Sequence, residues 1–401
     1  MEQRYKLHVK KPSIAILIAF IPLASIGAVV FTPGLPSIIR YFGVSERVGQ
    51  LPVAVFLLAY ALGQLIYGPI AARWGRKPTI YLGISVGILG SILAGLSGYV
   101  GSFAMLLSAL FVMALGTSSA LVLTFIIIND FYYQEDARKI VPLISTAFAV
   151  LPFLFVTMGG YLVRFASWES CFYLFALYCL GVLFACTRLP ETAPDLDPLA
   201  TRWGHIIKKY GEGFSSFHLV GFAIVAGGST ALLYLFSSTA PFIVINFLGV
   251  PPDVYGLLSL TISAAYLSGN LLSAHFSKSV SAVYCIRMGL LLMGAATSLF
   301  CGLFWSGIIN VYSFYIPIFF TYLSIPFVFS NAAVLATAQF HDKPTASSLM
   351  NFINMAVGIS GVFVIGFLPF SPLVAMPALF VAIWLCILPV FFSLKKICKL
   401  Q

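Results

Sequence analysis

The sequence has very little charge. Only 8% of its 401 residues are Asp, Glu, Lys or Arg, whereas a soluble domain carries about 25%. Hydrophobic residues make up 60% of the chain, and its mean hydropathy is +1.02. A chain of this composition cannot cover a surface that faces water. The solvent of this protein is therefore a lipid bilayer.

The few titratable residues lie near the ends of the apolar runs. None of the twelve acids falls in the middle of a run, and the five histidines are placed in the same way. The seven cysteines show no CxxC and no metal-ligand spacing. A membrane enzyme would need acids, histidines or metal ligands clustered near one interface. The sequence thus predicts no enzyme, no metal site and no cofactor.

Two further classes of protein are excluded by what the sequence lacks. There is no GxxxxGK[ST] phosphate loop and no soluble segment to hold one, which argues against a primary pump. The net charge of +10 is not gathered on one face, because the basic residues lie between apolar runs. We therefore expect no nucleic-acid partner.

Twelve apolar runs are long enough to cross a bilayer, which takes about 20 residues each. The N-terminal run continues into Pro33 and Pro36 without a cleavage site, so it is interpreted as a span and not as a signal peptide. The predicted fold is an all-α membrane protein with twelve transmembrane helices. The predicted spans are 13–38, 48–72, 78–98, 102–129, 139–164, 168–188, 217–242, 253–276, 281–304, 308–338, 345–369 and 371–394.

The positions of Lys and Arg orient these spans. With a cytoplasmic N-terminus, 19 of the 22 basic residues fall in cytoplasmic segments and only Arg40, Arg47 and Arg164 fall outside. This asymmetry predicts that both termini are cytoplasmic. The longest connection, 189–216, is a predicted cytoplasmic linker between six-helix bundles at 1–188 and 217–401. Two pseudo-symmetric halves of this kind are a transporter plan.

The loop after the second span, GPIAARWGRKP (68–78), is a tight basic turn. It resembles the signature loop of the major facilitator superfamily. FTPGLPSI (31–38), AYALGQLIYGP (59–69), NDFYYQEDAR (129–138) and LPET (189–192) are similar to segments of its bicyclomycin/chloramphenicol-resistance (Bcr/CflA-type) drug–proton antiporters. The resemblance covers nearly the whole chain. It implies a monomer in a bacterial inner membrane, with a central cavity and alternating access.

The resemblance also implies an inner gate on the cytoplasmic side. Asp130 matches an acid of the family at the end of the fourth helix, where Arg73 would be its partner. The simpler interpretation is an interfacial ion pair that contributes little, as exposed pairs do. The residues carried over to the gate are Gly68, Arg73, Gly75, Arg76 and Asp130.

The chain departs from the family pattern where the family carries charge. The usual acid of the signature loop is Ala72 here, and the acid of the first helix aligns with Val29. One fifth-helix proline remains as Pro152, while the other aligns with Val156. Proton coupling generally uses a buried titratable group in the pathway. Two interpretations stay open: an end-of-helix group such as Asp130 couples protons and loosens the gate, or transport is uncoupled from protons.

A cavity without midplane charge would be lined by aromatic and neutral polar groups. For each candidate the simpler interpretation is hydrogen bonding between helices or anchoring at the interface. The amides are stronger as a group, because amides in apolar spans must find partners. The candidates are Phe31, Thr32, Tyr60, Gln64, Thr124, Tyr234, Ser238, Tyr266, Asn270, Tyr322, Asn331, Asn351 and Asn354, with Pro152, Pro317 and Pro326 as hinges.

These features together predict a secondary active transporter. Its partners would be the bilayer, a small-molecule substrate and, in the antiporter interpretation, protons. We expect export of small amphipathic compounds, such as a drug or a siderophore-like metabolite. The alternatives are a nutrient or metabolite importer and a proton-independent uniporter on the same fold. A sensor that kept the fold and lost transport is less favoured.

Overall fold

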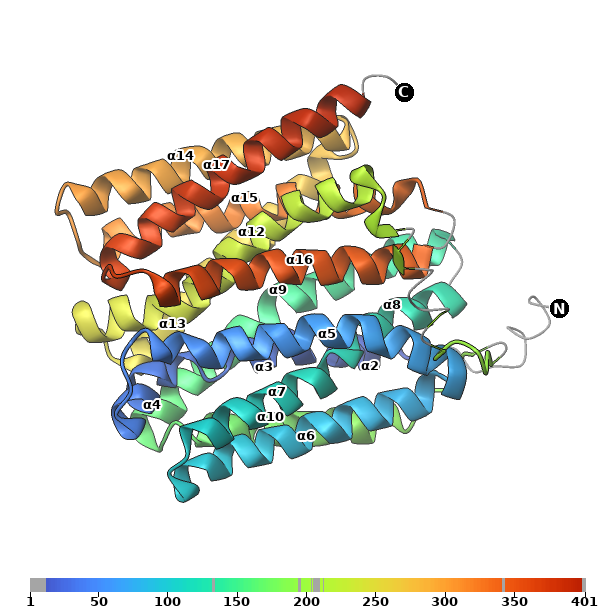
Figure 1. Ribbon diagram of the computed structural model, residues 1–401, viewed down its shortest axis with the longest axis horizontal. Coiled ribbons are helices and arrows are strands. Elements are labelled where there is room, and N and C mark those ends of the chain that lie inside the picture. Colours follow the sequence, from blue (N-terminus) through green and yellow to red (C-terminus); the bar gives the residue numbers. More distant parts are fainter. Residues whose placement is uncertain are drawn as a thin grey trace.

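The computed structural model is a stack of long helices that run side by side (Figure 1). It describes residues 12–131, 134–193, 196–202, 204, 210–211, 213–340 and 343–398. The basic residues expected on the cytoplasmic side at Arg4, Lys6, Lys10 and Lys11 lie outside these ranges. So do Lys208 and Lys209 of the predicted linker and its residues 194–195, 203, 205–207 and 212.

The helices before residue 189 form the first six spans. The first span consists of α2 (Ile14–Phe20), α3 (Leu23–Val29), η1 (Thr32–Gly34) and α4 (Leu35–Phe42). It is followed by η2 (Val48–Gln50), α5 (Leu51–Trp74), α6 (Arg76–Val100), α7 (Phe103–Thr117), α8 (Ser119–Phe131), α9 (Gln134–Phe165) and α10 (Ser170–Cys186).

The helices after residue 216 form the second six spans. They are α12 (Phe217–Pro241), continued by the π-helical η3 (Phe242–Phe247), then α13 (Pro252–Phe276), α14 (Ala282–Trp305), α15 (Val311–Ala338), α16 (Lys343–Phe367) and α17 (Pro372–Cys398). Eleven segments of the described chain are long and apolar enough to cross a membrane, and α10 is a shorter apolar helix. The predicted all-α, twelve-span fold is confirmed.

Local chemistry explains why two spans are broken. The first contains Pro22, Pro33 and Pro36, which lack the backbone N–H that continues a helix. Between α7 and α8, Thr117 Oγ1 donates to the Met113 carbonyl (2.9 Å) and Ser119 Oγ donates to the Gly116 carbonyl (2.8 Å). Such bonds compete with the helical ladder and bend it.

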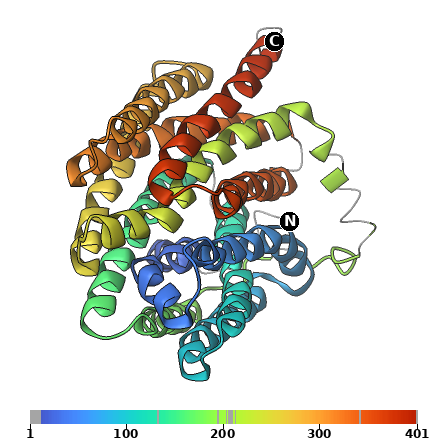
Figure 2. The ribbon, with the colours of Figure 1, turned by 60° about the vertical axis from the view of Figure 1, so that its left-hand side comes forward.

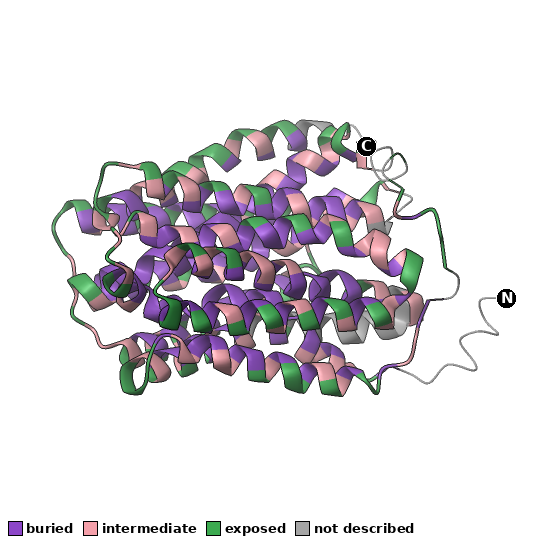
Figure 3. Ribbon diagram, turned by 60° about the horizontal axis from the view of Figure 1, so that its bottom comes forward, coloured by how far each residue is buried: buried purple, intermediate pink, exposed green. Residues whose placement is uncertain are grey.

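The outer faces of the bundle carry large apolar side chains. Leu177 is 67% exposed, Phe184 is 69% exposed and Leu291 is 64% exposed. In water such a surface would be an aggregation liability, whereas in lipid it is the solvent-facing surface. Figure 3 shows exposed residues on the outward faces and buried residues between the helices. The exposure pattern agrees with a multi-pass membrane protein.

The twelve spans pack as two six-helix bundles. In Figures 1 and 2 the N-terminal half, blue to green, lies below the C-terminal half, yellow to red. Two helix pairs make the most extensive contacts across the boundary, α5 with α16 and α9 with α13. We call the end that holds Gly75 and Glu191 the linker end. The end that holds the turns at Gly43, Gly101, Gly249 and Gly307 is the opposite end.

Glycines let α6 and α7 pack backbone to backbone. A Cβ at Gly116 would collide with the Gly87 nitrogen and would lie 2.6 Å from the Gly83 carbonyl oxygen. Small residues at such crossings are the usual way for membrane helices to approach closely. The contact lies within the first bundle, so no movement between the bundles relieves it.

We therefore expect Gly116→Ala to destabilise the protein. The added methyl meets backbone, and overpacking of this kind costs about 1–3 kcal/mol. A lower melting temperature of the purified protein in detergent would show it. The control is Gly181→Ala on α10, where a Cβ would meet nothing within 4 Å. Equal melting temperatures for the two variants would contradict this account of the packing.

Candidate functional site

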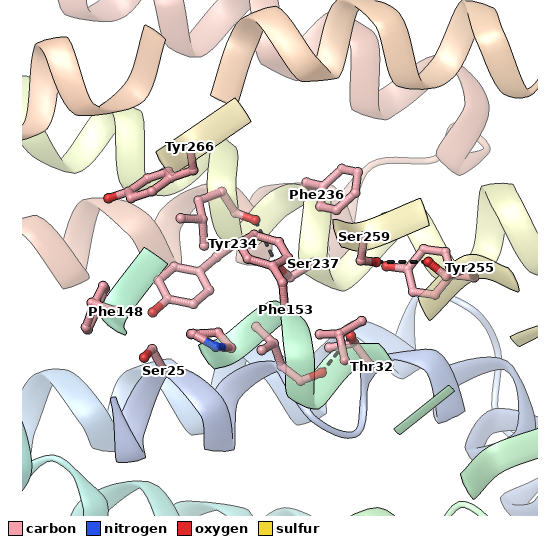
Figure 4. Close-up of a pocket in the computed structure, with 14 residues that line it drawn as sticks. Ser25, Thr32, Phe148, Phe153, Tyr234, Phe236, Ser237, Tyr255, Ser259 and Tyr266 are labelled. Atoms are coloured by element: carbon pink, nitrogen blue, oxygen red, sulfur yellow. Dashed lines mark hydrogen bonds between the residues drawn. The ribbon is translucent and has the colours of Figure 1, made fainter. Parts of the chain in front are cut away.

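A cavity lies between the two bundles (Figure 4). Its walls come from α3, η1 and α9 on one side and from α12 and α13 on the other. The volume is about 40 Å³, which holds about three water molecules. Pockets for drug-sized ligands measure about 300–1,000 Å³. The bundles must therefore move apart before such a ligand can bind.

The cavity is neutral. None of the fourteen side chains that line it within the described residues is charged. Those with hydroxyl groups can accept hydrogen bonds as well as donate them. The lining residues are Ser25, Val29, Thr32, Phe148, Pro152, Phe153, Val156, Leu233, Tyr234, Phe236, Ser237, Tyr255, Ser259 and Tyr266.

The aliphatic hydroxyls of the lining are turned toward their own helices. Ser25 Oγ donates to the Pro22 carbonyl (3.0 Å), and Thr32 Oγ1 donates to the Val29 carbonyl (2.8 Å). Ser237 and Ser259 donate in the same way to residues 233 and 255, each at 3.0 Å. The hydroxyl protons are thus bonded to carbonyls of their own helices, while the lone pairs of the hydroxyl oxygens stay available to a ligand. These groups suit a ligand that donates hydrogen bonds and carries apolar surface.

Only some of the predicted cavity residues reach this cavity. Thr32, Tyr234 and Tyr266 line it, and so does the predicted hinge Pro152. Tyr322 lies just behind the wall, with its ring 5.4 Å from that of Phe236. The predicted residues that are not among the lining are Phe31, Tyr60, Gln64, Thr124, Ser238, Asn270, Tyr322, Asn331, Asn351 and Asn354.

Several of these residues have structural contacts instead. The Phe31 ring stacks on Phe172 at 5.4 Å, inside the first bundle. Asn331 joins α15 to α13, because its Nδ2 donates to Ser273 Oγ (3.1 Å). Thr124 and Ser238 donate to carbonyls of their own helices, at 2.7 and 3.1 Å. Asn270 and Asn351 are half-buried.

Sequence reasoning missed ten of the lining residues, but two of them carried a signal. Val29 and Val156 are the positions that align with an acid and a proline of the family, and both line the cavity. The position at which the family acid is missing, Val29, therefore lies in the cavity wall. The serines gave no such signal, because a serine in an apolar helix commonly bonds its own backbone.

A charged cluster lies at the linker end. Arg76 Nε donates to Asp130 Oδ2 (2.8 Å), and Arg76 Nη1 donates to the Ala71 carbonyl (2.9 Å). The two side chains are only 13% and 17% exposed, so solvent screens the pair less than a surface pair. The prediction that Arg73 is the partner of Asp130 was wrong. Arg73 lies on the last turn of α5, before Gly75, and donates to Thr201 Oγ1 of the linker.

Glu191 of the LPET segment binds the turn between α5 and α6. Its carboxylate accepts the backbone N–H groups of Arg76 and Lys77, both at 2.9 Å, which are the first two of α6. A negative group at this position satisfies unpaired donors and complements the helix dipole. Gly75 has a φ of +94°, and a Cβ there would lie 2.8 Å from Glu191 Oε2. Glycine at position 75 is thus required by both conformation and space.

Gly68 is the gate candidate that faces the other bundle. A Cβ at this position would meet only Ser348 Oγ of α16, at an ordinary 3.9 Å. Its packing therefore does not demand glycine in this conformation. The other contacts of the cluster join residues of the first bundle and the linker.

Burial raises the pKa of Asp130 above its ordinary value. The hydrogen bond and the charge of Arg76, together with the Thr192 hydroxyl, oppose the shift, while the nearby Glu191 carboxylate adds to it. Asp130 lies two residues beyond the apolar span that ends at Ile128. It is therefore a titratable group at the edge of the membrane whose protonation is easier than that of a free aspartate.

The opposite end is closed by contacts between the bundles. Thr157 Oγ1 of α9 donates to the Gly256 carbonyl of α13 (2.8 Å). A Cβ at Gly160 would collide with the Pro252 carbonyl, so the two backbones touch. Arg164 and Asp253 form an ion pair at 3.7 Å near the same crossing.

We predict that Glu191→Ala lowers the melting temperature. The change removes the acceptor for the first N–H groups of α6, and loss of a helix cap costs about 1–2 kcal/mol. The matched control is Asp197→Ala on the same linker, whose carboxylate accepts the N–H of Leu199, two residues away, and caps no helix of the bundle among the described residues. Unchanged melting of Glu191→Ala, or equal losses for both, would show that Glu191 does not stabilise the turn.

Comparison with known proteins agrees with this architecture. The sequence is 29% identical over 68% of the chain to an uncharacterized transporter of Rickettsia bellii, and the match spans 66% of that relative. It is 26% identical to the bicyclomycin resistance protein homolog of Haemophilus influenzae, over 84% of each chain. It is 25% identical to multidrug resistance protein D of Escherichia coli, over 75% of the chain and 74% of the relative.

A solved structure shares the fold. A D-xylose-proton symporter superposes with a TM-score of 0.74 over 93% of this chain and 96% of that chain, at 14% identity. The sequence profile described as Major Facilitator Superfamily matches residues 17–362. The resemblance to the Bcr/CflA-type proteins is confirmed at modest identity by the Haemophilus influenzae relative. The chain belongs to the Major Facilitator Superfamily.

Proposed function

We propose that this transporter exports small, neutral, amphipathic molecules from the bacterial cytoplasm, acting as a monomer in the inner membrane. The observation that carries the proposal is the uncharged cavity between the bundles. The names of two relatives, a bicyclomycin resistance protein homolog and a multidrug resistance protein, support export of drug-like compounds. A permanent ion would have to lose its hydration in this cavity without finding a countercharge.

The proposed movement is a rocking of residues 1–188 against 217–401, with 189–216 as the cytoplasmic linker. The basic turn at Arg76 and Lys77 supports a cytoplasmic position for the linker end and for both termini. Outward opening would then separate α9 from α13 near Gly160, where the backbones touch in this conformation. Pro152 in the cavity wall, and Pro317 and Pro326 within the continuous α15, are the proposed hinges.

Asp130 is the proposed site of proton coupling, within a gate that also includes Gly68, Arg73, Gly75 and Arg76. Its pKa is raised in this conformation, so protonation lowers the cost of burying it. As the pH falls toward that raised pKa, this conformation binds the proton before one in which Asp130 is exposed. Acidification therefore stabilises the conformation seen here. Protonation of Asp130 would thus hold this conformation in place, whereas one of the two interpretations of the sequence has protonation loosen the gate.

We expect substrate to drive proton movement in liposomes that contain a pH-sensitive dye. The substrate is chloramphenicol, a neutral compound with an amide and two hydroxyls, added outside liposomes that are acidic inside, because an antiporter then exchanges internal protons for external compound. Asp130→Asn should abolish the substrate-dependent proton flux and flatten the pH dependence of transport, because the residue no longer titrates. The dye signal and the uptake of labelled compound are measured in parallel.

The matched control is Asp197→Asn on the linker, which should keep the proton flux. Movement of the compound without proton flux in the unmodified protein would refute coupling and leave a uniporter. Proton flux that survives in Asp130→Asn would assign coupling to another group. No movement of any neutral compound would refute the proposed export.

A further inference from the structure

A second group of polar atoms is buried beside the cavity, on α5 and α16. Gln64 and Asn354 are fully buried. Within the described part of the chain neither amide atom of Gln64 makes a hydrogen bond of standard geometry, although the Tyr60 hydroxyl lies near enough to interact with this side chain. Asn354 Nδ2 has no partner there either. The hydroxyl of the fully buried Tyr60 likewise makes no hydrogen bond of standard geometry among the described residues. Buried polar groups normally find partners, so each of these calls for an explanation.

Helix geometry turns these side chains toward the second bundle. Tyr60, Gln64 and Gly68 recur at intervals of four residues, so they share one face of α5. Gly68 faces Ser348 of α16, and near the other end of α5 the Arg47 carbonyl faces Gly366. α5 and α16 therefore run antiparallel along one register. That register sets Gln64 opposite the turn of α16 that begins at Asn351.

The group is continuous with the cavity through α12. Asn354 Oδ1 accepts a hydrogen bond from Thr230 Oγ1 (2.7 Å). Tyr234 follows Thr230 by one turn, lines the cavity and lies close to Tyr60. The polar atoms thus sit where α5 of the first bundle meets α12 and α16 of the second. Any rocking of the bundles changes this junction.

The polar atoms of this group are uncharged and include both donors and acceptors of hydrogen bonds. Gln64 offers one carbonyl and one NH₂, Asn354 offers a second NH₂, and Tyr60 offers a hydroxyl. A secondary amide, or a hydroxyl that donates and accepts, would satisfy both kinds of atom. An ammonium group would find no countercharge among these residues or in the cavity lining.

We propose that Gln64, with Tyr60 and Asn354, forms a hydrogen-bonding subsite that recognises a neutral donor–acceptor group of the substrate. This assignment rests on the proposed transport of neutral compounds. Gln64 determines specificity because its carbonyl and its NH₂ are separate atoms that can accept and donate at the same time, and neither has a partner among the described residues. The apolar remainder of the ligand would occupy the enlarged cavity beyond Tyr234.

The test is equilibrium binding of two radiolabelled compounds to purified protein in detergent. Chloramphenicol carries an amide and two hydroxyls, whereas triphenylmethane is bulky, neutral and apolar with no hydrogen-bonding group. Gln64→Leu should weaken chloramphenicol binding by about tenfold or more, since a polar group buried without its partner is expensive. Binding of triphenylmethane should change by less than about twofold, because it makes no hydrogen bond with Gln64.

The matched control is Gln50→Leu. Gln50 is also buried and its Oε1 also has no partner in the described chain, but it lies about 21 Å along α5 from Gln64. The Gln50→Leu variant should bind both compounds as tightly as the unmodified protein does. Equal losses for both compounds in Gln64→Leu, or no loss for either, would overturn the subsite. Unmodified protein that binds triphenylmethane but not chloramphenicol would overturn it as well. If the unmodified protein bound neither, the proposed function would fail, and the subsite with it.

Discussion

Contact between the two bundles governs everything that the interior of this protein can do. The bundles meet chiefly along α5 with α16 and along α9 with α13, and the second of these pairs lines the cavity together with α3, η1 and α12. At the opposite end the contact is backbone to backbone near Gly160 and Pro252, which leaves no space between the two helices there. A cavity of about 40 Å³ follows from that closure. A drug-sized ligand enters only when one of these pairs separates, so substrate binding and conformational change are linked.

Charge is confined to the ends of the helices, and this separates recognition from coupling. The cavity lining offers hydroxyls, aromatic rings and aliphatic groups, while Arg76, Asp130 and Glu191 gather at the linker end. In transporters, ionisable residues within the membrane mark the pathways of substrates and ions. Here Val29 stands where the resemblance implies an acid. A proton that acts at Asp130 would therefore change the balance between conformations without touching the substrate.

Much of the fold was predictable from the sequence, because lipid imposes a length and an apolar composition on each span. The breaks at Pro22 and between Thr117 and Ser119 were not predicted, since they depend on local backbone bonding. The site was harder. Asn331 and Gln64 look alike in sequence, as amides in apolar helices, yet Asn331 joins two helices and both amide atoms of Gln64 lack partners in the described chain. Only three-dimensional packing separates those roles. The partner of Asp130 was misassigned for a similar reason: the turn at Gly75 carries Arg76, and not Arg73, over the carboxylate.

The positions of the buried amides favour a particular order of events. Gln64 and Tyr60 belong to α5, while Asn354 and Thr230 belong to α16 and α12, so the subsite is complete only when the bundles are together at this level. A ligand that bonds both sides would gain most from the closed arrangement and would draw the bundles together around itself. The unsatisfied amides oppose closure without such a ligand, because burying them unpaired is costly. Substrate would then lower the barrier to the movement that exports it, and the empty protein would make that movement less readily.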